Sequence, residues 1–217
     1  MDFEIARRNM VASQLRPNEV TDAGVLAAMG ALPRERFLPK PRQPMAYIDE
    51  DLEIAPGRYL MEPVTAARLV QAAGVGAGDN CLVVGPGTGY LAAVVGRLAA
   101  SVFALEQDAD LAARMSALIT DMALDNVVIV EGPHAAGWPK ESPYDVIVID
   151  GAAPEIPAAL GEQLEEGGRL AAVIGGPGQV GRLTLGVKHN GVLSHRALFD
   201  AMVQPAAGFE REAGFVF

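Results

Sequence analysis

Runs of apolar residues alternate with amphipathic stretches from about residue 80 onward, and this rhythm predicts repeated strand–helix units. The apolar runs are continuous, which is typical of parallel strands that helices cover on both faces. The expected strands span residues 81–84, 102–105, 127–130, 146–149 and 170–174. The expected helices span residues 90–100, 109–123 and 156–164, the last closed by Gly167 and Gly168. Repeated units of this kind predict a doubly wound sheet.

The first third of the chain has helical spacing instead. Apolar residues among the first 15 positions predict a helix that ends before Pro17. Asp22 can cap a second helix, which Pro33 ends. Residues 39–63 are rich in proline and indicate an extended loop with short strand-like pieces, and Pro63 opens a third helix.

Near the C-terminus, apolar and polar residues alternate in two stretches, residues 182–188 and 192–198. Asn190-Gly191 between them is the favoured pair for a type I′ turn, so we expect an antiparallel hairpin. The whole pattern predicts an α/β fold: a Rossmann-like doubly wound sheet of about seven strands with a helical N-terminal extension and this hairpin. We expect one domain, residues 1–217, with a helical part (1–75) and an α/β core (76–217).

Composition narrows the function classes. Half of the 217 residues are hydrophobic, which is enough for a sizeable core, and the net charge of −10 disfavours a nucleic-acid partner. The single cysteine, Cys81, excludes an intramolecular disulfide and a multi-cysteine zinc site, and we expect it in the core. Three scattered histidines predict no metal site, and His189 and His195 are expected at the surface. With no signal-like or membrane-spanning apolar stretch, we expect a cytoplasmic protein without a membrane partner.

A glycine-rich turn supplies the first chemical signal. Gly85-Pro86-Gly87-Thr88-Gly89-Tyr90 follows an expected strand and opens an expected helix, where free N–H groups favour a ligand close to the backbone. Glu106 ends the next strand, about 20 residues on, where a carboxylate can accept both hydroxyls of a ribose. The pair predicts an adenosine-containing cofactor; the alternative is a tight turn with a purely structural role.

The details of the turn favour one cofactor. A dinucleotide fingerprint requires glycine at the sixth position, where this chain has the bulky Tyr90. No Gly-Lys-Ser/Thr follows, which excludes a P-loop. Glycines at 85, 87 and 89 instead suit S-adenosylmethionine, which has no pyrophosphate.

Short motifs that reach from Arg8 to Gly175 extend this signal. They are Met10-Val11, Gln14-Leu15, Asp22, Val25-Leu26, Ala28-Met29, Pro33-Arg34-Glu35, Phe37, Pro39, Ala46-Tyr47, Asp49, the glycine turn, Glu106, Gly137-Trp138-Pro139, Tyr144-Asp145, Ala152-Ala153-Pro154-Glu155-Ile156-Pro157, Gln163-Leu164 and Gly167-Gly168-Arg169-Leu170. Together they resemble the protein-L-isoaspartate O-methyltransferases. The resemblance implies a seven-strand doubly wound fold. It also implies methyl transfer from S-adenosylmethionine, which leaves S-adenosylhomocysteine, to isoaspartyl residues of damaged proteins.

The resemblance also suggests site residues. The candidates for cofactor binding are Gly85, Gly87, Thr88, Gly89, Tyr90, Glu106, Gln107 and His134. His134 has an alternative interpretation as an exposed loop residue. The family serine at the reaction centre corresponds to Met61, which donates no hydrogen bond, so no catalytic residue is assigned; Thr65 and Tyr59 are weak candidates to replace it.

Further departures leave three functions open. Val83 and Pro133 stand where the family carries acidic residues, and Glu62 adds a negative charge beside Met61. The first function is an isoaspartyl-type methyltransferase, active or weakened. The second is an inactive paralogue that binds a protein or a nucleoside. The third is a methyltransferase for another substrate that uses Asp150 or Glu62.

Overall fold

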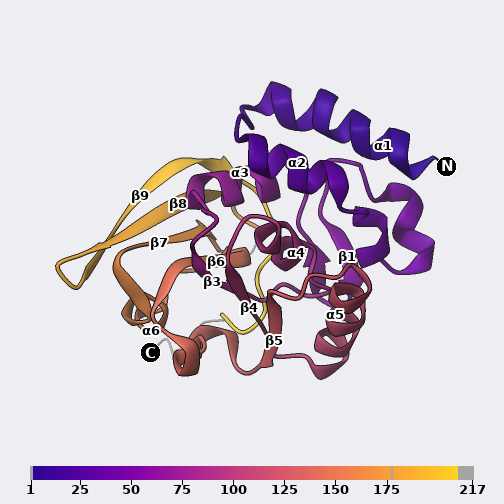
Figure 1. The fold of residues 1–217 in the computed structure, drawn as a ribbon. Coiled ribbons are helices and arrows are strands. Elements are labelled where there is room, and N and C mark those ends of the chain that lie inside the picture. The colour runs from indigo at the N-terminus through magenta and orange to yellow at the C-terminus, as the bar shows by residue number, and fades with distance from the viewer. Residues whose placement is uncertain (1, 177, 210–217) are drawn as a thin grey trace, which may run out of the picture.

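A seven-stranded sheet forms the centre of the computed structural model, which describes residues 2–176 and 178–209. Its strands are β3 (Asn80–Val84), β4 (Ser101–Glu106), β5 (Val127–Glu131), β6 (Tyr144–Ala153), β7 (Leu164–Ile174), β8 (Gly181–His189) and β9 (Val192–Ala201). The spatial order is β5-β4-β3-β6-β7-β8-β9 (Figure 1). All pairs from β5 to β7 are parallel, whereas β8 and β9 pair antiparallel. The predicted doubly wound sheet and its C-terminal hairpin are confirmed.

Both faces of the parallel strands are buried, as their continuous apolar runs predict. In β3, Cys81 and Val83 belong to a core on one face, while Leu82 and Val84 belong to a core on the other. This alternation follows from the strand geometry, in which successive side chains point to opposite faces. The expected core position of Cys81 is confirmed, and burial raises the pKa of its thiol to about 12.

Helices cover the two faces unequally. The first core joins the sheet to α1 (Phe3–Met10), α2 (Ala23–Ala31), α3 (Pro63–Ala73), α4 (Tyr90–Gly96) and α5 (Ala109–Asp121). On the opposite face pack α6 (Ala158–Glu162), the short 3₁₀ turn at His134–Ala136, Trp138, and two residues near the C-terminus, Ala206 and Phe209. Among the described residues no helix is long and apolar enough to cross a membrane.

The N-terminal region agrees with the sequence pattern in its helices and differs in its connections. Asp22 caps α2, where its carboxylate accepts the Val25 N–H at 2.9 Å. As predicted, the first helix ends before Pro17: α1 ends at Met10 and a π-helical turn (Val11–Leu15) follows it. Pro17 lies in a separate 3₁₀ turn (Arg16–Asn18), early enough to be tolerated.

The proline-rich stretch is more ordered than an extended loop. After a 3₁₀ turn at Arg34–Phe37, it contains a second one at Lys40–Met45 and then a hairpin of β1 (Leu52–Ala55) and β2 (Arg58–Leu60). This hairpin confirms the expected short strand-like pieces. Pro56 and Gly57 make its turn, with Gly57 at a φ of 69°. This short hairpin carries Arg58 toward the main sheet.

The helix expected at 156–164 is confirmed over Ala158–Glu162, but its expected closure by Gly167 and Gly168 is wrong. Helix α6 ends at Glu162, and β7 begins at Leu164, so Gly167 and Gly168 lie inside a strand. A side chain at Gly168 would meet the Glu165 carbonyl oxygen at 2.8 Å, so the glycine permits a close backbone approach beside an irregular register of β6 and β7. The helix expected at 90–100 is also shorter and ends at Gly96.

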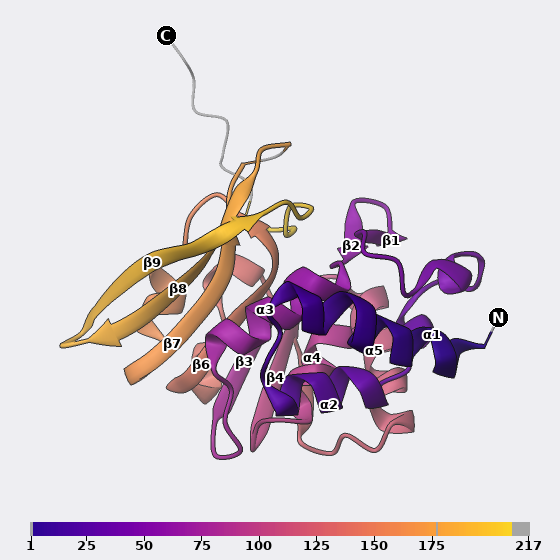
Figure 2. The same cartoon turned by 90° about the horizontal axis from the view of Figure 1, so that it is seen from above.

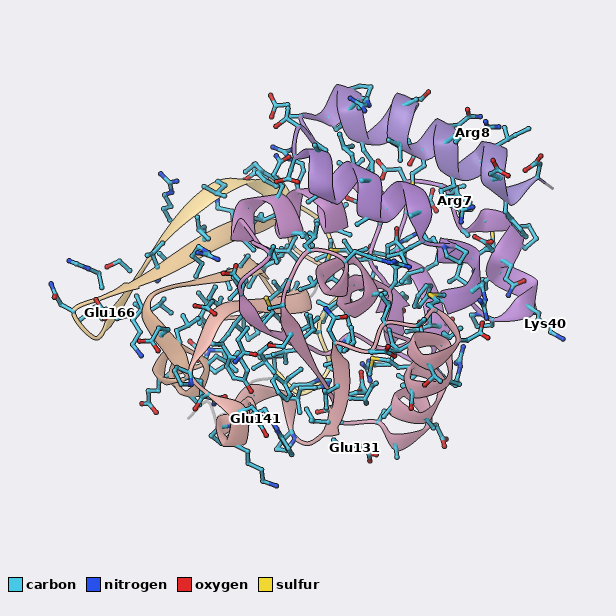
Figure 3. The ribbon with its side chains drawn as sticks, in the orientation of Figure 1. Arg7, Arg8, Lys40, Glu131, Glu141 and Glu166 are labelled. Carbon is cyan, nitrogen blue, oxygen red and sulfur yellow. The ribbon has the colours of Figure 1, made fainter. Side chains whose placement is uncertain are left out.

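The long hairpin β8–β9 extends to the side opposite the N-terminal end of α1 (Figure 2). Its turn has positive φ at Asn190 (51°) and Gly191 (75°), as the expected type I′ turn requires. The carboxylate of Glu166, exposed on β7, accepts the N–H groups of both turn residues (Figure 3). His189 and His195 are exposed here, as predicted.

After β9 the chain turns back over the carboxyl ends of the parallel strands. Pro205 forms a parallel bridge with Ala152 at the end of β6. We call residues 204–209 the return segment. Its position over the sheet edge decides the shape of the candidate site.

Candidate active site

The glycine turn lies at the carboxyl edge of β3, beside the ends of β4 and β6, where ligands bind in doubly wound sheets. Gly85, Gly87 and Gly89 all have positive φ, at 72°, 59° and 96°. A Cβ atom on Gly87 would lie 2.5 Å from the Ile54 side chain, and one on Gly89 would lie 2.6 Å from that of Met115. Both positions therefore require glycine for backbone conformation, and at Gly89 the Met115 side chain also leaves no space for a Cβ atom.

Thr88 and Tyr90 of the turn are also buried. The Thr88 hydroxyl donates to the Phe37 carbonyl oxygen at 2.7 Å. Tyr90 begins α4, and its ring packs edge-on against Phe37 and under the Arg34 guanidinium. These contacts anchor the turn to the N-terminal region, so Thr88 and Tyr90 position its backbone.

Glu106 lies at the end of β4 with a completely buried side chain. Its carboxylate accepts the N–H groups of Gly87 (2.9 Å), Gln107 (2.9 Å) and Asp108 (3.0 Å). Arg58 donates to both carboxylate oxygens, at 2.8 and 2.6 Å. Burial would raise the pKa of Glu106, but the hydrogen bonds from Arg58 and the Asp108 N–H, together with the Arg58 charge, outweigh it, and the pKa falls to about 2.

These donors leave Glu106 no acceptor capacity for a ligand. A carboxylate offers about four lone-pair sites, and five N–H groups already point at this one. The sequence suggests that Glu106 holds the hydroxyls of a ribose; in this conformation the Arg58 guanidinium takes that place. The neighbouring strand carries a glutamate in a different environment: Glu131, the register partner of Glu106 on β5, is exposed, whereas Glu106 is buried (Figure 3).

His134 is buried, so its interpretation as an exposed loop residue is wrong. Its Nδ1 lies 2.7 Å from the Ala207 carbonyl oxygen, which can only accept, so Nδ1 donates. Its Nε2 accepts the Gln107 N–H at 3.0 Å. The Phe209 ring stacks on the imidazole with the ring centroids 6.3 Å apart. Gln107 and His134 therefore do come together beside Glu106, under the return segment.

The residues near the family serine position also have partners within the protein. Met61 is buried, and its carbonyl oxygen accepts from the Arg34 guanidinium at 2.6 Å. The Thr65 hydroxyl donates to the Glu62 carboxylate, which leaves that proton unavailable to a substrate. Tyr59 is half-buried and lines the small cavity beside the glycine turn.

Acidic side chains surround this cavity. Asp51 accepts the N–H groups of Glu62 and Gln204, both at 2.7 Å. Burial, and then the nearby Asp51, raise the pKa of Asp150 to about 7 despite the opposing charges of Arg34 and Arg58. Burial also raises the pKa values of Asp51 and Glu62. An anionic acceptor would therefore meet carboxylates here, and Asp150 can take up a proton near neutral pH.

The cavity has a volume of about 10 Å³, room for one water molecule. It is lined by Asp51, Arg58, Tyr59, Met61, Gly85, Asp150, Gly151 and residues 203–207. Pockets for cofactor-sized ligands have volumes of about 300–1,000 Å³. The turn and Glu106 have the chemistry of a nucleoside site, yet in this conformation the residues do not fit S-adenosylmethionine. A larger hollow of about 710 Å³ lies between α6 and the hairpin, away from the glycine turn.

Sequence reasoning missed three parts of this site: Arg58, Asp51 and the return segment. No local pattern marks them, because each acquires its role from a partner far along the chain: Arg58 from Glu106, and Asp51 from Gln204. Of the two other departures from the family pattern, Val83 is a buried core residue, and Pro133 precedes the 3₁₀ turn that begins at His134.

Comparisons with known proteins identify the family. Residues 6–208 match the family model described as protein-L-isoaspartate(D-aspartate) O-methyltransferase. The chain is 37% identical over 206 residues to the protein-L-isoaspartate O-methyltransferase of Koribacter versatilis, which covers 95% of this chain and 92% of that protein. A solved protein-L-isoaspartate O-methyltransferase superposes with a TM-score of 0.82 at 26% identity, over 94% of this chain and 67% of the other.

A second solved structure shares the fold. It is a protein-L-isoaspartate O-methyltransferase from Plasmodium falciparum in complex with S-adenosyl-L-homocysteine, with a TM-score of 0.77 at 22% identity over 96% of this chain and 99% of that one. The motifs, the sheet order and these matches agree: the chain belongs to the protein-L-isoaspartate O-methyltransferase family, whose enzymes use S-adenosylmethionine.

Proposed function

We propose that this chain methylates the carboxylate of isoaspartyl residues in proteins, with S-adenosylmethionine as the methyl donor. The observation that carries the proposal is the built glycine turn at the carboxyl edge of β3, whose Gly87 N–H is held by Glu106. Gly85 and Gly89 would admit the cofactor close to the backbone. In a conformation in which Arg58 leaves Glu106, that carboxylate with Gln107 would receive the ribose. His134 would lie beside its adenine.

The acceptor requires little chemical activation. A carboxylate with a pKa near 4 is ionised at neutral pH without a general base. When bound, S-adenosylmethionine supplies an electrophilic methyl group, and the protein aligns the acceptor and excludes water. The Met61 side chain lines the cavity but cannot donate a hydrogen bond to the acceptor. The hydroxyl of Thr65 already donates to Glu62. We therefore expect weak alignment and a low turnover.

The acidic lining of the cavity favours a second candidate, methyl transfer to a neutral oxygen or nitrogen acceptor. Asp51 and Asp150 in this lining would repel an isoaspartyl carboxylate but tolerate a neutral group. The pKa of Asp150, about 7, suits a general base that removes the acceptor's proton. For either candidate we infer a cytoplasmic setting, consistent with the lone buried thiol of Cys81.

A methyl-transfer assay separates these functions. The full chain is incubated with labelled S-adenosylmethionine and an isoaspartyl peptide, its aspartyl isomer, or no peptide. We expect label only in the isoaspartyl peptide, released as methanol by mild alkali because a methyl ester hydrolyses. The Glu106→Gln variant, checked for folding by a thermal melt, should lose most of this transfer. No label at millimolar peptide would refute the first candidate, and alkali-stable label in another acceptor would favour the second.

A further inference from the structure

The return segment is fastened to the carboxyl edge of the sheet by specific backbone contacts. Ala206 donates its N–H to the Ala152 carbonyl oxygen at 2.8 Å, and the Ala152 N–H donates to the Gln204 carbonyl oxygen at 3.0 Å. On its other side, the Gln204 N–H donates to Asp51 at 2.7 Å. The segment therefore bridges the sheet and the loop that precedes β1.

Its last residues cover the nucleoside end of the candidate site. The Ala207 carbonyl oxygen accepts from His134, and the Phe209 side chain, only 6% exposed, stacks on the same imidazole. A Cβ atom on Gly208 would lie 2.4 Å from the Gln107 side-chain oxygen. An aromatic ring and a peptide group thus occupy the neighbourhood of His134 and Gln107 that the proposed function assigns to the adenosine of the cofactor.

Arg58 closes the site from the opposite direction. It reaches from β2 to Glu106 with both carboxylate oxygens engaged, and its side chain is 11% exposed. This guanidinium and the return segment line the same small cavity beside Gly85. The two groups come from parts of the chain about 150 residues apart, yet both occupy contacts that a nucleoside would use.

We propose that Arg58 and the return segment form an internal gate, so that the adenosine of the cofactor binds only when both withdraw from Glu106, Gln107 and His134. The gate rests on the proposed function for the location of the cofactor. In the free protein, the gate blocks the cofactor site. Arg58 occupies the position of the ribose hydroxyls beside Glu106, and the Phe209 ring occupies the position of the adenine beside His134.

The Arg58 contact can open without leaving the buried Glu106 carboxylate unpaired, and part of the return segment is already in solvent. Withdrawal of Arg58 leaves Glu106 with three backbone N–H donors, from Gly87, Gln107 and Asp108. Gln204 and Pro205 in the return segment are exposed to solvent. For a gated site the apparent dissociation constant is the intrinsic one divided by the open fraction, so weakening the gate must tighten binding.

The test is calorimetric titration of the full chain with S-adenosylhomocysteine. Two variants weaken the gate independently: Arg58→Met removes the guanidinium, and Phe209→Ala removes the stacked ring. Because a hydrogen bond to a charged group corresponds to about a 10- to 100-fold change in equilibrium, Arg58→Met should bind about 10- to 100-fold more tightly than wild type. Phe209→Ala should move affinity in the same direction, which guards against a folding defect in either variant.

Matched controls separate the gate from general effects. Arg182→Met removes an exposed arginine of β8, and Met202→Ala changes an exposed residue just before the return segment. Both should bind like the wild type. Equal dissociation constants for all five proteins would overturn the proposal. Absence of binding to every protein at millimolar ligand would overturn it too, since an open gate must expose the site.

Hydrogen–deuterium exchange supplies a readout that does not depend on activity. Saturating S-adenosylhomocysteine should speed exchange at the amides of residues 204 and 206, because both hydrogen bonds break when the gate opens. Slower exchange there would mean that the ligand binds beneath an undisturbed segment, and the gate would be rejected.

The proposed function and the gate fail in different ways. If the gate variants bind the ligand tightly but transfer no methyl group to an isoaspartyl peptide, the proposed function fails and the gate stands. If the wild type transfers methyl groups and the variants show unchanged affinity, the gate fails and the proposed function stands.

Discussion

Two hairpins of this molecule contrast in what they do and in how they are encoded. The long hairpin β8–β9 lies at the sheet edge, exposes much of its second strand, and follows from its alternating pattern and its Asn190-Gly191 turn. The short hairpin β1–β2 lies in a proline-rich stretch without such a pattern, yet it delivers Arg58 to the buried carboxylate of Glu106. The comparison teaches that the locally encoded element is peripheral to the candidate site, while the element that closes the site is encoded by distant contacts.

The largest loss of stability should come from removing the Glu106 carboxylate, which Arg58 of the short hairpin contacts. Glu106→Ala leaves the Arg58 guanidinium and the Gly87 N–H without their buried partner, which should lower the free energy of unfolding by about 3–5 kcal/mol. The control is Glu166→Ala beside the long hairpin, whose carboxylate is exposed and should leave the melting temperature nearly unchanged. Thermal unfolding followed by circular dichroism measures both, and comparable losses would contradict the contrast.

Alanine substitutions of glycines near the two hairpins should also differ in how much they lower the free energy of unfolding. Gly87→Ala forces a Cβ atom to 2.5 Å from the Ile54 side chain of β1 and strains a positive φ, so we expect a loss of about 2–4 kcal/mol. Gly191→Ala strains its φ but meets no atom within 4 Å, so we expect about 1 kcal/mol. Urea unfolding measures both; a larger loss at Gly191 would show that the glycine turn relaxes freely.

The acidic cavity beside the short hairpin predicts a pH dependence. Because the pKa of Asp150 is about 7 when folded and near its ordinary value of 3.8 when unfolded, the unfolded chain releases its proton first. The contribution of Asp150 to stability is present below pH 3.8 and is lost as the pH rises to 7. Asp150→Asn should therefore gain about 1–3 kcal/mol over the wild type at pH 8 and much less at pH 5.

Urea unfolding at these two pH values tests the prediction. The exposed Asp200→Asn on β9 serves as the control and should show no such difference between the two pH values. An equal gain from Asp150→Asn at both pH values would show that Asp150 does not carry the effect.

The smallest effect should be at the turn of the long hairpin. Asn190 has a φ of 51°, which glycine tolerates and β-branched residues do not. Asn190→Gly should change stability by less than about 0.5 kcal/mol, whereas Asn190→Val should cost about 1 kcal/mol or more. Chemical denaturation measures the stability of both variants. Equal stability losses in Asn190→Gly and Asn190→Val would mean that the turn changes type.

The sequence predicts most of the fold where the signal is local. The apolar runs place the parallel strands, Asp22 marks the start of α2, and Asn190-Gly191 marks the long hairpin. It fails where a contact across the sheet overrides local pattern. Gly167 and Gly168 suggest the end of a helix, but they lie in β7, where Gly168 approaches the backbone of Glu165 too closely for a side chain.

The same division holds at the candidate site. The sequence by itself determined the family, the glycine turn and the acidic residue at the end of β4, because backbone conformation and strand ends depend on neighbours along the chain. Only the tertiary structure decided that Glu106 is paired with Arg58, that His134 is buried and that the return segment covers His134 and Gln107. These contacts join residues tens to more than a hundred positions apart, and their energy arises from desolvated charge and close packing, which no spacing along the chain records.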